Sequence, residues 1–494
     1  MTYDYDLAVI GGGAAGLTAA GIAANAGVRT LLVERAARPD GRARLGGDCT
    51  WTGCIPSKTL LHAAGVAQVI REGTPGLEGT EPTVDFAAVM AHVRATREHV
   101  FREADDPALY EGFGVEVVRG TARFINPNAV EIEGEQRRRV TGRFFVLCTG
   151  GRPALPPLDG LRDVPFYTSD TLFEIDRQPR HLLVLGAGPV GIEMAQAFAR
   201  LGSEVTVVGR DRRILPRDDA AHAATLQGVL ESEGVRFVLG AKATRVEREG
   251  DALLLHLDPL GAPLRGDALL IATGRRPNVE GLGLELAGVE YTEDGITVDD
   301  RCRTSRSHIY AAGDGTGAYQ LTHMSEHMAK VAVTNAVLRL PMTVDHAHVP
   351  WVTYTDPELA HLGATEDELA GRGEKFEVYR FPYARLDRAI TEGETVGEVK
   401  VLATTWTGTI LGVSVLGARA GELIAIYAVA MKAGASLKTL ADTIHPYPTY
   451  GLGARRAADQ WYARKQFPLA VKALQKVFGY RGEVPPPPDP DRIV

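Results

Sequence analysis

The opening of the chain alternates two short apolar runs with a longer stretch of small residues. The segment YDLAVIGGGAAGLTAAGIAANAGVRTLLVER passes from an apolar run through Gly11, Gly13 and Gly16 into an alanine-rich stretch, and ends with a second apolar run and Glu34. This order predicts a strand, a helix and a second strand. Glycines at such a turn let backbone N–H groups and a helix N-terminus approach a pyrophosphate, and the acid receives ribose hydroxyls. The segment therefore predicts a dinucleotide-binding βαβ unit.

A second copy of the pattern, LLVLGAGPVGIEMAQAFARLGSEVTVVGR, carries Gly186, Gly188 and Gly191. In the first copy the acid lies 23 positions after the first glycine, whereas the same offset from Gly186 reaches Gly209. The arginines that follow are Arg210, Arg212, Arg213 and Arg217. A missing carboxylate beside arginines is how such a site accommodates a 2′-phosphate. The pattern therefore favours NADPH over NADH at the second site, and the alternative is a solvated basic turn.

Three further apolar runs end in loops that contain glycine. FFVLCTGGRP and ALLIATGRRPN each resemble a strand that returns beneath a bound nucleotide and leaves through a Gly-Arg-Pro turn, and they suggest domain boundaries near Pro153 and Gly274. HIYAAGDGTG ends a strand at Gly313 and Asp314. A carboxylate at the C-terminal end of a strand is placed to hold a ribityl or ribose hydroxyl. These runs extend both nucleotide-binding units.

Length and composition narrow the class of protein. The 494 residues suggest about three domains, and 45% apolar with 23% charged residues describes an ordinary globular protein. The formal charge of -8 argues against nucleic acid as a partner, because nucleic-acid binding needs a basic face. Four cysteines are too few for a disulfide framework, so we expect a reducing, cytoplasmic compartment. We find no signal-peptide pattern, and no apolar run reaches the roughly 18 residues of a membrane-spanning helix.

The stretch GGDCTWTGCIPSK, which begins at Gly46, holds a pair of cysteines. In an ideal helix Cys49 and Cys54 would have Cα atoms about 8.6 Å apart, beyond the roughly 7 Å limit for a disulfide. A bridge therefore requires a break in the helix, which Gly53 permits. Pro56 suits a first helical turn, so Cys54 is expected at a helix N-terminus, where a thiolate is stabilised. A redox pair is favoured over a structural crosslink or a metal site, because CxxxxC has no second Cys/His pair nearby.

The other two cysteines have a different setting. Cys148, inside an apolar run, is expected to be a buried core thiol, and Cys302, in the polar stretch RCRTSRSH, an incidental one. The combination of a redox pair with two nucleotide sites indicates a flavin that relays electrons from a nicotinamide to a disulfide.

On these motifs the chain resembles the FAD-dependent pyridine nucleotide-disulfide oxidoreductases, which include dihydrolipoamide dehydrogenase, glutathione reductase and mercuric reductase. The resemblance covers about residues 4 to 460. It is carried by Gly11 to Gly16 with Glu34, Cys49 to Lys58, Gly186 to Glu193, Gly313 with Asp314, and the stretch WVTYTDPELAHLG.

The resemblance implies a role for each matching residue. The first fingerprint would hold FAD and the second NADPH or NADH. Cys49 would be the interchange thiol that faces the substrate, and Cys54 the charge-transfer thiol against the flavin. Lys58, paired with Glu193, would lie near flavin N5 and place positive charge where hydride arrives. The remaining cofactor-binding residues would be Gly46, Gly47, Thr149, Gly150, Gly313, Asp314, Arg210 and Gly274.

The acid–base residue of this family is a histidine directly before Pro-Thr, which reaches across a homodimer interface, and a glutamate follows three residues after the threonine. In TIHPYPTYGLGARR, Tyr447 stands before Pro-Thr and Leu452 takes the glutamate position. A phenol does not accept a proton at neutral pH as an imidazole does. Exchange with lipoamide or glutathione therefore loses its usual base, and His445 is the alternative base.

Mercuric reductases have a tyrosine in this region, and the GGDC and PYPTY pieces resemble that branch. Hg(II) is held by thiolates, although the C-terminal cysteine pair that captures it in those enzymes has no counterpart after Cys302. We expect an NAD(P)H-dependent flavin disulfide reductase of mercuric-reductase type, in which hydride passes through FAD to the Cys49–Cys54 disulfide and the dithiol reduces a thiol-bound metal ion or a disulfide. The alternatives are an enzyme of dihydrolipoyl dehydrogenase type that uses His445, and a flavoprotein redox sensor or electron carrier.

The expected fold is α/β, with two Rossmann-like nucleotide-binding domains and a C-terminal α+β domain that makes a homodimer. The expected segments are 1–155 (FAD domain, first part), 156–274 (NAD(P) domain), 275–345 (FAD or central domain, second part), 346–465 (dimerisation domain) and 466–494 (C-terminal helix and tail). In the last segment an amphipathic basic helix is predicted from Leu469, Ala473, Leu474 and Val477 with Lys472 and Lys476, and a Pro-rich tail from Pro485. We expect this helix to pack on the dimer, and the alternative is a contact with a membrane surface.

Overall fold

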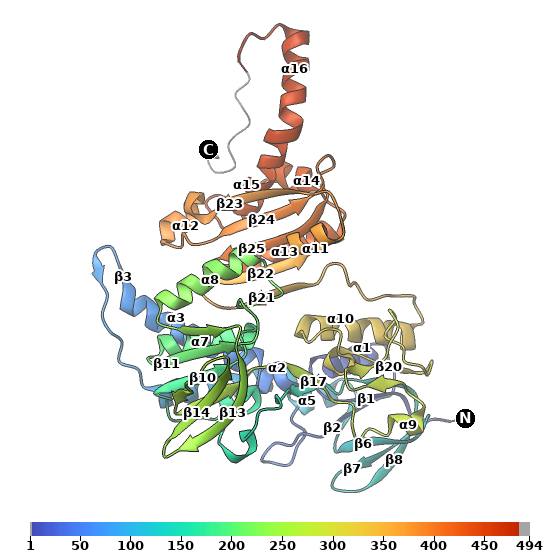
Figure 1. Ribbon diagram of the computed structural model, residues 1–494. Coiled ribbons are helices and arrows are strands. Elements are labelled where there is room, and N and C mark those ends of the chain that lie inside the picture. Colours follow the sequence, from blue (N-terminus) through green and yellow to red (C-terminus); the bar gives the residue numbers. More distant parts are fainter. Residues whose placement is uncertain (1, 484–494) are drawn as a thin grey trace. The chain divides into compact units, whose positions relative to one another are not determined.

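The computed structural model of the chain describes residues 2–483, apart from the side chains of residues 465–469. The chain forms two compact units, whose elements are labelled in Figure 1. The first unit comprises Met1–Gly186, Ala197–Val208 and Ala241–Val344, and the second comprises Ala187–Gln196, Gly209–Gly240 and Asp345–Val494. The Pro-rich tail predicted from Pro485 lies outside the described residues.

The largest sheet of the first unit grows from the N-terminal βαβ pattern. Strands β1 (Tyr5–Ile10) and β2 (Thr30–Glu34) are parallel neighbours joined by α1 (Ala14–Asn25). The strand order is β5-β2-β1-β8-β7-β6, and β20 pairs with β8. The other strands are β5 (Val115–Arg119), β6 (Thr121–Asn126), β7 (Ala129–Glu133), β8 (Arg138–Leu147) and β20 (Ile309–Ala311). Strands β5, β2, β1, β8 and β20 run parallel, so their carboxyl ends share one edge, where ligands of such sheets bind.

Helices α1 and α10 (Thr322–Val333) pack against each other and against this sheet (Figure 1). Helices α2 (Gly47–Trp51), α3 (Cys54–Glu72) and α4 (Phe86–Val100) also pack together. Helix α4 continues into the π-helical turn η1 (Phe101–Asp105), and α5 (Pro107–Gly112) follows. The redox stretch is therefore built into a helical layer of the first unit.

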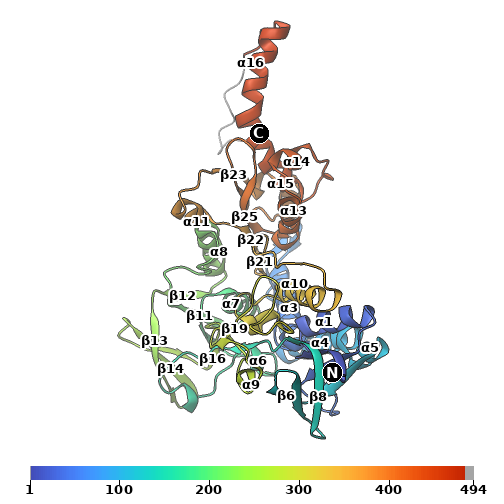
Figure 2. The same ribbon diagram turned by 90° about the vertical axis from the view of Figure 1, so that its right-hand side faces the viewer.

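The second βαβ pattern also folds as predicted. Strand β10 (His181–Leu185) lies between β11 (Glu204–Gly209) and β16 (Ala268–Ile271) and is parallel to both, while α7 (Pro189–Arg200) contributes residues to both units. Figure 2 shows the antiparallel hairpin of β13 (Lys242–Glu249) and β14 (Ala252–Asp258), to which β15 (Leu264–Gly266) is added. The two Gly-Arg-Pro turns become β9 (Gly151–Pro153) and β17 (Arg275–Pro277), which pair with each other.

An antiparallel sheet in the order β21-β22-β25-β24-β23 forms the centre of the second unit. Its strands are β21 (Pro350–Thr353), β22 (Glu358–Gly363), β23 (Glu377–Pro382), β24 (Glu398–Ala403) and β25 (Ile410–Gly417). The accompanying helices are α8 (Ala220–Ser232), α11 (Glu366–Gly371), α12 (Asp387–Glu392), α13 (Ala420–Lys432), α14 (Leu437–Asp442), α15 (Leu452–Trp461) and α16 (Phe467–Phe478).

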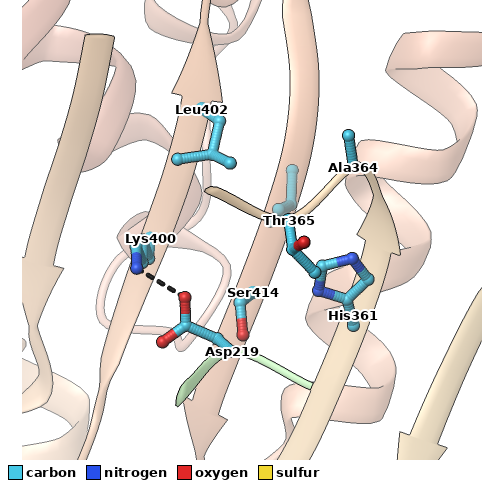
Figure 3. Close-up of a pocket in the computed structure, with 8 residues that line it drawn as sticks. Asp219, His361, Ala364, Thr365, Lys400, Leu402 and Ser414 are labelled. Atoms are coloured by element: carbon cyan, nitrogen blue, oxygen red, sulfur yellow. Dashed lines mark hydrogen bonds and ion pairs between the residues drawn. The ribbon is translucent and has the colours of Figure 1, made fainter. Parts of the chain in front are cut away.

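One face of this sheet is polar yet buried. Lys400, Ser414 and His361 are direct cross-strand neighbours and therefore point to the same side. Helix α8 covers that side, and its N-cap Asp219 accepts a hydrogen bond from the Lys400 ammonium. His222 of α8 places Nδ1 2.7 Å from Ser414 Oγ. Figure 3 shows a small cavity lined by these strands and Asp219. The sequence analysis gave no indication of this buried polar layer.

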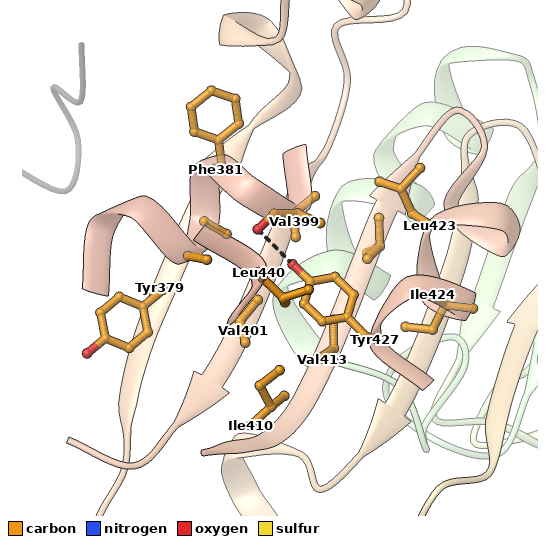
Figure 4. Packing of buried hydrophobic residues seen from close by; sticks show 14 of the residues in the cluster. Tyr379, Phe381, Val399, Val401, Ile410, Val413, Leu423, Ile424, Tyr427 and Leu440 are labelled. Carbon is orange, nitrogen blue, oxygen red and sulfur yellow. Dashed lines mark hydrogen bonds between the residues drawn. The ribbon is translucent and has the colours of Figure 1, made fainter. Parts of the chain in front are cut away.

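The opposite face of the same sheet is apolar, as Figure 4 shows. Val399, Val401 and Val413 lie on this face, in one buried cluster with Tyr427 of α13. The hydroxyl of Tyr427 donates to the carbonyl oxygen of Ala454 at 3.5 Å, so its polar end is satisfied inside the core. Successive strand residues thus alternate between the polar and the apolar layer.

Short elements complete the fold. They are β3 (Gly73–Thr74), β4 (Leu77–Glu78), η2 (Leu161–Asp163), α6 (Ser169–Leu172), β12 (Arg236–Leu239), α9 (Leu284–Ala287), β18 (Tyr291–Thr292), β19 (Gly295–Ile296), η3 (Gly313–Thr316), η4 (Thr334–Leu338), η5 (Tyr383–Arg385) and η6 (Tyr462–Gln466). Among residues 2–483, no helix combines the length and the apolar content that crossing a membrane requires.

Candidate active site

The turn between β1 and α1 has the geometry that a dinucleotide needs. Gly11 has a φ of +106°, and a Cβ there would lie 2.1 Å from the carbonyl oxygen of Cys148, so only glycine fits. At Gly13, by contrast, a Cβ would touch only the Cα of Gly47, at 3.6 Å, among the described residues outside its own turn. Helix α1 begins here without a side-chain cap on its N–H groups. Open space beside a glycine and uncapped N–H groups together fit a pyrophosphate.

Glu34 stands beside this turn at the end of β2. Its Oε2 accepts from the N–H of Gly12 and its Oε1 from the N–H of Ala36, each at 2.7 Å. The carboxylate is therefore held in one orientation at the carboxyl edge of the sheet. Gly16 lets α1 approach β1, because a Cβ there would lie 1.8 Å from the carbonyl oxygen of Gly11. These residues fit the adenosine diphosphate part of FAD.

The redox stretch folds as two helices with a break between the cysteines. Cys49 lies in α2, and Cys54 is the first residue of α3. The break falls at Gly53, where a Cβ would lie 2.9 Å from the carbonyl oxygen of Asp48. The structure thus has the interruption that a contact between the two cysteines requires. Both cysteines are half-buried, and the structure shows no disulfide bond between them.

The two thiols form a hydrogen-bonded pair next to Thr322, the first residue of α10. The hydroxyl of Thr322 contacts both thiols and lies 3.4 Å from the Sγ of Cys54. The hydrogen bond with Cys54, together with burial, raises the pKa of the Cys49 thiol, and the hydrogen bond with Thr322 opposes that rise. The pair therefore retains a proton, and its second ionisation is suppressed. Thr322 lies 268 positions from Cys54, and no motif in the sequence marked it.

Lys58 follows Cys54 by one helical turn. Residues four apart on a helix share a face, so the ammonium group lies on the face of α3 that carries Cys54. Its expected partner Glu193 lies in α7 and is 5% exposed. The Oε1 of Glu193 accepts from the backbone N–H of Tyr354 at 2.8 Å. Glu193 thus holds the backbone that follows β21, and its pairing with Lys58 stays a prediction.

Trp51, between the two cysteines, anchors the redox stretch. Its Nε1 donates to the carbonyl oxygen of Leu45 at 2.7 Å, and its own carbonyl oxygen accepts from Arg97 Nη1 at 3.0 Å. The guanidinium groups near its ring belong to Arg38, Arg44 and Arg97, at 5.5, 5.4 and 5.8 Å from the ring centroid. These distances lie within cation–π range. The buried indole therefore fixes the backbone between the thiols, a role that the sequence analysis missed.

A buried carboxyl group supports the same stretch. The hydroxyl of Thr50, next to Cys49, donates to Asp105 Oδ2 at 2.5 Å. Burial raises the pKa of Asp105, and the hydrogen bond from Thr50 opposes the rise. Asp105 lies 55 positions from Thr50, at the end of the π-helical turn η1. Sequence spacing gave no sign of this contact.

Asp314 lies in the short 3-10 helix η3 directly after β20, at the carboxyl edge of the sheet. Burial raises the pKa of its carboxyl group, and Arg275 opposes that rise. The Nε of Arg275 lies 3.5 Å from Asp314 Oδ2, and its Nη2 also contacts Asp48, the residue before Cys49. Asp314 therefore belongs to a chain of charges that reaches the redox stretch. Its predicted contact with a ribityl hydroxyl stays a prediction.

The other predicted flavin-side residues lie at the paired Gly-Arg-Pro turns. Gly150 and Gly274 have φ values of +66° and +116°. The hydroxyl of Thr149 donates to the carbonyl oxygen of Asn278 at 2.8 Å. Gly46 lies beside the first glycine turn, since its N–H donates to the carbonyl oxygen of Gly12 at 2.8 Å. The structure thus brings Gly46 and Gly47 to the first fingerprint, as their assignment to the same cofactor requires.

The second fingerprint has the same glycine geometry as the first, but Gly209 takes the place of the acid. Gly186 has a φ of +124°, and a Cβ there would lie 2.2 Å from the carbonyl oxygen of Ala272, whereas a Cβ on Gly188 would meet nothing within 4 Å among the described residues. At Gly209, a Cβ would lie 2.8 Å from a side-chain carbon of Leu239. A carboxylate could not replace Gly209 without displacing that neighbour.

The arginines after Gly209 divide into two groups. Arg210, Arg212 and Arg217 are exposed. Arg213 is half-buried and donates from Nη2 to the carbonyl oxygen of Pro216 at 2.7 Å, so it stabilises its own turn. The exposed arginines Arg210, Arg212 and Arg217 remain the candidates for a 2′-phosphate.

The acid–base segment between α14 and α15 is largely exposed. Tyr447 is 69% exposed, and His445 is also exposed, with its Nδ1 3.0 Å from the carbonyl oxygen of Thr443. Leu452, at the family's glutamate position, is 5% exposed and belongs to the apolar core of Figure 4. The glutamate position has therefore become part of the hydrophobic core.

The two cysteines outside the redox stretch are both buried. This agrees with the prediction for Cys148, whose pKa is raised by burial. Cys302, expected to be an incidental thiol, is buried despite its polar neighbours. Cys302 has 0% exposure, and burial raises the pKa of its thiol to about 12. The N–H of Ala311 donates to the carbonyl oxygen of Cys302, which draws this turn onto β20 and turns the thiol inward.

The chain is similar to known proteins over most of its length. Residues 5–329 match the family model of the pyridine nucleotide-disulphide oxidoreductases, and residues 349–457 match the dimerisation domain of that family. The chain is 35% identical over 461 residues to a mercuric reductase of Streptomyces lividans, covering 92% of this chain and 95% of that protein. It is 37% identical over 471 residues to a dihydrolipoyl dehydrogenase of Thermus scotoductus, covering 92% and 97%.

A similar structure has also been solved. The Cu(II) complex of the HOCl-induced flavoprotein disulfide reductase RclA from Escherichia coli has a TM-score of 0.82 at 29% identity, covering 93% of this chain and 99% of that one. The two Rossmann-like sheets, one around β1 and one around β10, and the antiparallel sheet of the C-terminal domain agree with the expected α/β fold class. The chain therefore belongs to the pyridine nucleotide-disulphide oxidoreductases, a family of oxidoreductases that use FAD and NAD(P)H.

Proposed function

We propose that this enzyme uses NADPH to reduce a soft metal ion that is held by thiolates, with Hg(II) as the representative acceptor, and that Cys49 and Cys54 deliver the electrons. The observation that carries the proposal is the exchange at the acid–base segment. An exposed phenol, Tyr447, stands where a thiol–disulfide reductase has its imidazole, and the accompanying carboxylate is replaced by the core residue Leu452. Proton transfer to a disulfide substrate has thus lost its usual groups, whereas the thiol pair is complete.

When bound, FAD supplies two-electron transfer between the nicotinamide and the cysteine pair. The chain's own residues then handle the acceptor. Cys49 binds the metal by displacing one thiolate ligand, and its proton leaves with that ligand, so the exchange needs no separate base. The Thr322 hydroxyl, in contact with both sulfur atoms, stabilises the thiolate that remains. Lys58, on the same helical face as Cys54, adds positive charge beside the pair.

The reaction balances without a further co-reactant. The reduced pair, one thiol and one thiolate, gives up two electrons and one proton as a bond forms between the Sγ atoms of Cys49 and Cys54. The electrons reduce Hg(II) to Hg(0), the proton converts one of its thiolate ligands into a thiol, and the other ligand leaves as a thiolate. The likeness to a mercuric reductase and to a flavoprotein disulfide reductase solved with Cu(II) supports a soft metal acceptor.

The nucleotide and the assembly complete the proposal. The glycine at position 209, where a carboxylate would bind the ribose, and the exposed Arg210 and Arg212 favour NADPH over NADH. The match to a dimerisation domain supports a homodimer. We place the enzyme in a reducing compartment, the cytoplasm, in keeping with its free redox thiols.

The test is steady-state NADPH oxidation by the FAD-loaded enzyme with three acceptors at matched concentrations: thiol-complexed Hg(II), oxidised lipoamide and oxidised glutathione. The rate without acceptor is the control for electron loss to oxygen. We expect turnover with Hg(II) to exceed turnover with either disulfide by more than about tenfold. Turnover with a disulfide alone would contradict the proposal.

A second candidate is a dihydrolipoyl dehydrogenase-type enzyme in which His445 is the base. The observation in its favour is the 37% identity to the dihydrolipoyl dehydrogenase of Thermus scotoductus. Lipoamide-dependent turnover that is lost in His445→Gln would establish this alternative. Reduction of the cysteine pair without sustained turnover on any of the three acceptors would instead indicate a redox sensor or an electron carrier.

A further inference from the structure

The C-terminal helix α16 exposes apolar side chains to solvent. Leu474, Val477 and Phe478 are 43%, 72% and 62% exposed. Tyr480, just after the helix, is 63% exposed, and its ring stacks on Phe478 at 5.8 Å. In both Figure 1 and Figure 2, α16 extends away from the sheet of its own unit. An apolar surface of this kind requires a partner.

The apolar and basic positions of α16 lie on opposite faces. At 100° per residue, the apolar residues from Ala470 to Phe478 fall within an arc of about 160°. Lys472, Gln475 and Lys476 occupy the rest of the circumference. A two-helix seam needs only a narrow apolar stripe, whereas a helix that lies in a lipid interface has a broad apolar face and lysines on the other.

An exposed tryptophan stands near the start of this segment. The turn between β24 and β25 touches the end of α15, because the Nε1 of Trp461 donates to the carbonyl oxygen of Thr405 at 3.3 Å. Trp406, in the same turn, is 73% exposed. Because η6 and α16 continue directly from Trp461, the exposed indole of Trp406 lies near the start of the amphipathic segment. Trp and Tyr favour the boundary between lipid and water.

The charge of the segment is opposite to that of the protein. The whole chain carries a formal charge of -8, whereas residues 462–483 contain five basic residues and one acidic residue. The basic residues are Arg464, Lys465, Lys472, Lys476 and Arg481. A basic segment at the end of an acidic protein is complementary to an anionic surface.

We propose that α16 binds the surface of an anionic lipid bilayer, with Leu474, Val477 and Phe478 in the acyl boundary and Lys472 and Lys476 among the headgroups. The enzyme would then work at a membrane surface without spanning it. The sequence pattern was expected to favour packing on the dimer, but the breadth of the apolar arc and the basic opposite face favour lipid. This inference is independent of the acceptor proposed above.

The test is vesicle flotation of the full-length, FAD-loaded enzyme, with phosphatidylcholine vesicles that contain 30% or no phosphatidylglycerol. We expect binding only with phosphatidylglycerol, weakened by high salt. Phe478→Asp on the apolar face and the double variant Lys472→Glu/Lys476→Glu should each weaken partitioning at least about tenfold. Gln475→Asp, on the polar face, is the matched control for one added charge and should weaken it much less.

NADPH oxidation should be unchanged in all these variants, which shows that they fold. Analytical sedimentation of the same samples measures their self-association. It tests the competing hypothesis that a second copy of the chain covers the apolar face of α16. Failure of the wild-type enzyme to bind phosphatidylglycerol vesicles would overturn the proposal. So would a loss of self-association in Phe478→Asp, because the apolar face would then be covered by protein.

Discussion

The redox stretch keeps the residues of the family pattern, whereas the acid–base segment replaces them. The redox stretch from Gly46 to Lys58 keeps both thiols and the glycine break, and Trp51 and Thr50 tie it to buried groups. In the acid–base segment an exposed tyrosine and the core leucine Leu452 replace the imidazole and the carboxylate. The residues to which the resemblance assigns electron transfer are thus retained, whereas those to which it assigns proton transfer have changed. The metal acceptor proposed above rests on this difference.

The largest effect is expected for a substitution in the redox stretch, at Cys49. Cys49→Ser removes the thiol proposed to face the acceptor, so acceptor-dependent NADPH oxidation should fall by roughly three orders of magnitude or more. Reduction of bound FAD by NADPH, followed by its absorbance in a stopped-flow experiment, should persist. Cys302→Ala, which removes a buried thiol outside the redox stretch, is the control. Retention of acceptor turnover in Cys49→Ser would mean that the dithiol does not carry the electrons.

In the acid–base segment, we expect restoring the family's glutamate at Leu452 to lower the stability of the fold and not to add activity. Leu452→Glu would put back the family's carboxylate, but at a position that is 5% exposed in the core of the second unit. A buried carboxylate without a partner should lower the free energy of unfolding by roughly 3 kcal/mol or more, whereas Leu452→Met should cost less than about 1.5 kcal/mol. Urea unfolding followed by tryptophan fluorescence measures both. If Leu452→Glu is stable and gains disulfide reductase activity, the position faces the active site and not the core.

A smaller effect is expected where the thiols meet α10. Thr322→Val keeps the shape but removes the hydroxyl that opposes the raised pKa of Cys49. The pKa should rise further, so alkylation of the reduced enzyme by iodoacetamide should slow about two- to tenfold at a fixed pH, and its pH profile should move upward. Thr322→Ser retains the hydroxyl and should behave as wild type. Equal rates in Thr322→Val and Thr322→Ser would show that the hydroxyl does not act on the pair.

The sequence predicted those features that depend on local geometry. Gly11, Gly186 and Gly53 each meet a backbone or turn requirement that can be argued from a few neighbouring residues, and the structure shows the close approaches that make glycine necessary. The same holds for the helix that begins at Cys54 and for the amphipathic α16.

The residues that contact the redox stretch from distant parts of the chain could not be predicted in this way. Thr322 and Asp105 reach the redox stretch from 268 and 55 positions away, through the packing of helices whose register no local pattern encodes. Lys400 lies within an apolar run, and only the pairing of its strand reveals that it faces a buried carboxylate. The burial of Cys302 could not be predicted either, because polar neighbours describe a turn's composition and not the direction of one side chain.

The most direct test of the central claim is a single-turnover experiment. The FAD-loaded enzyme is reduced without oxygen by one equivalent of NADPH and mixed with either thiol-complexed Hg(II) or oxidised lipoamide, and reoxidation is followed for wild type and Tyr447→Phe. We predict that Hg(II) reoxidises the enzyme faster than lipoamide does, and that Tyr447→Phe changes the Hg(II) rate by less than about threefold, because no proton passes through the phenol. Faster reoxidation by lipoamide, with a loss of about a hundredfold in Tyr447→Phe, would contradict the account and make the tyrosine the acid–base residue of a disulfide reductase.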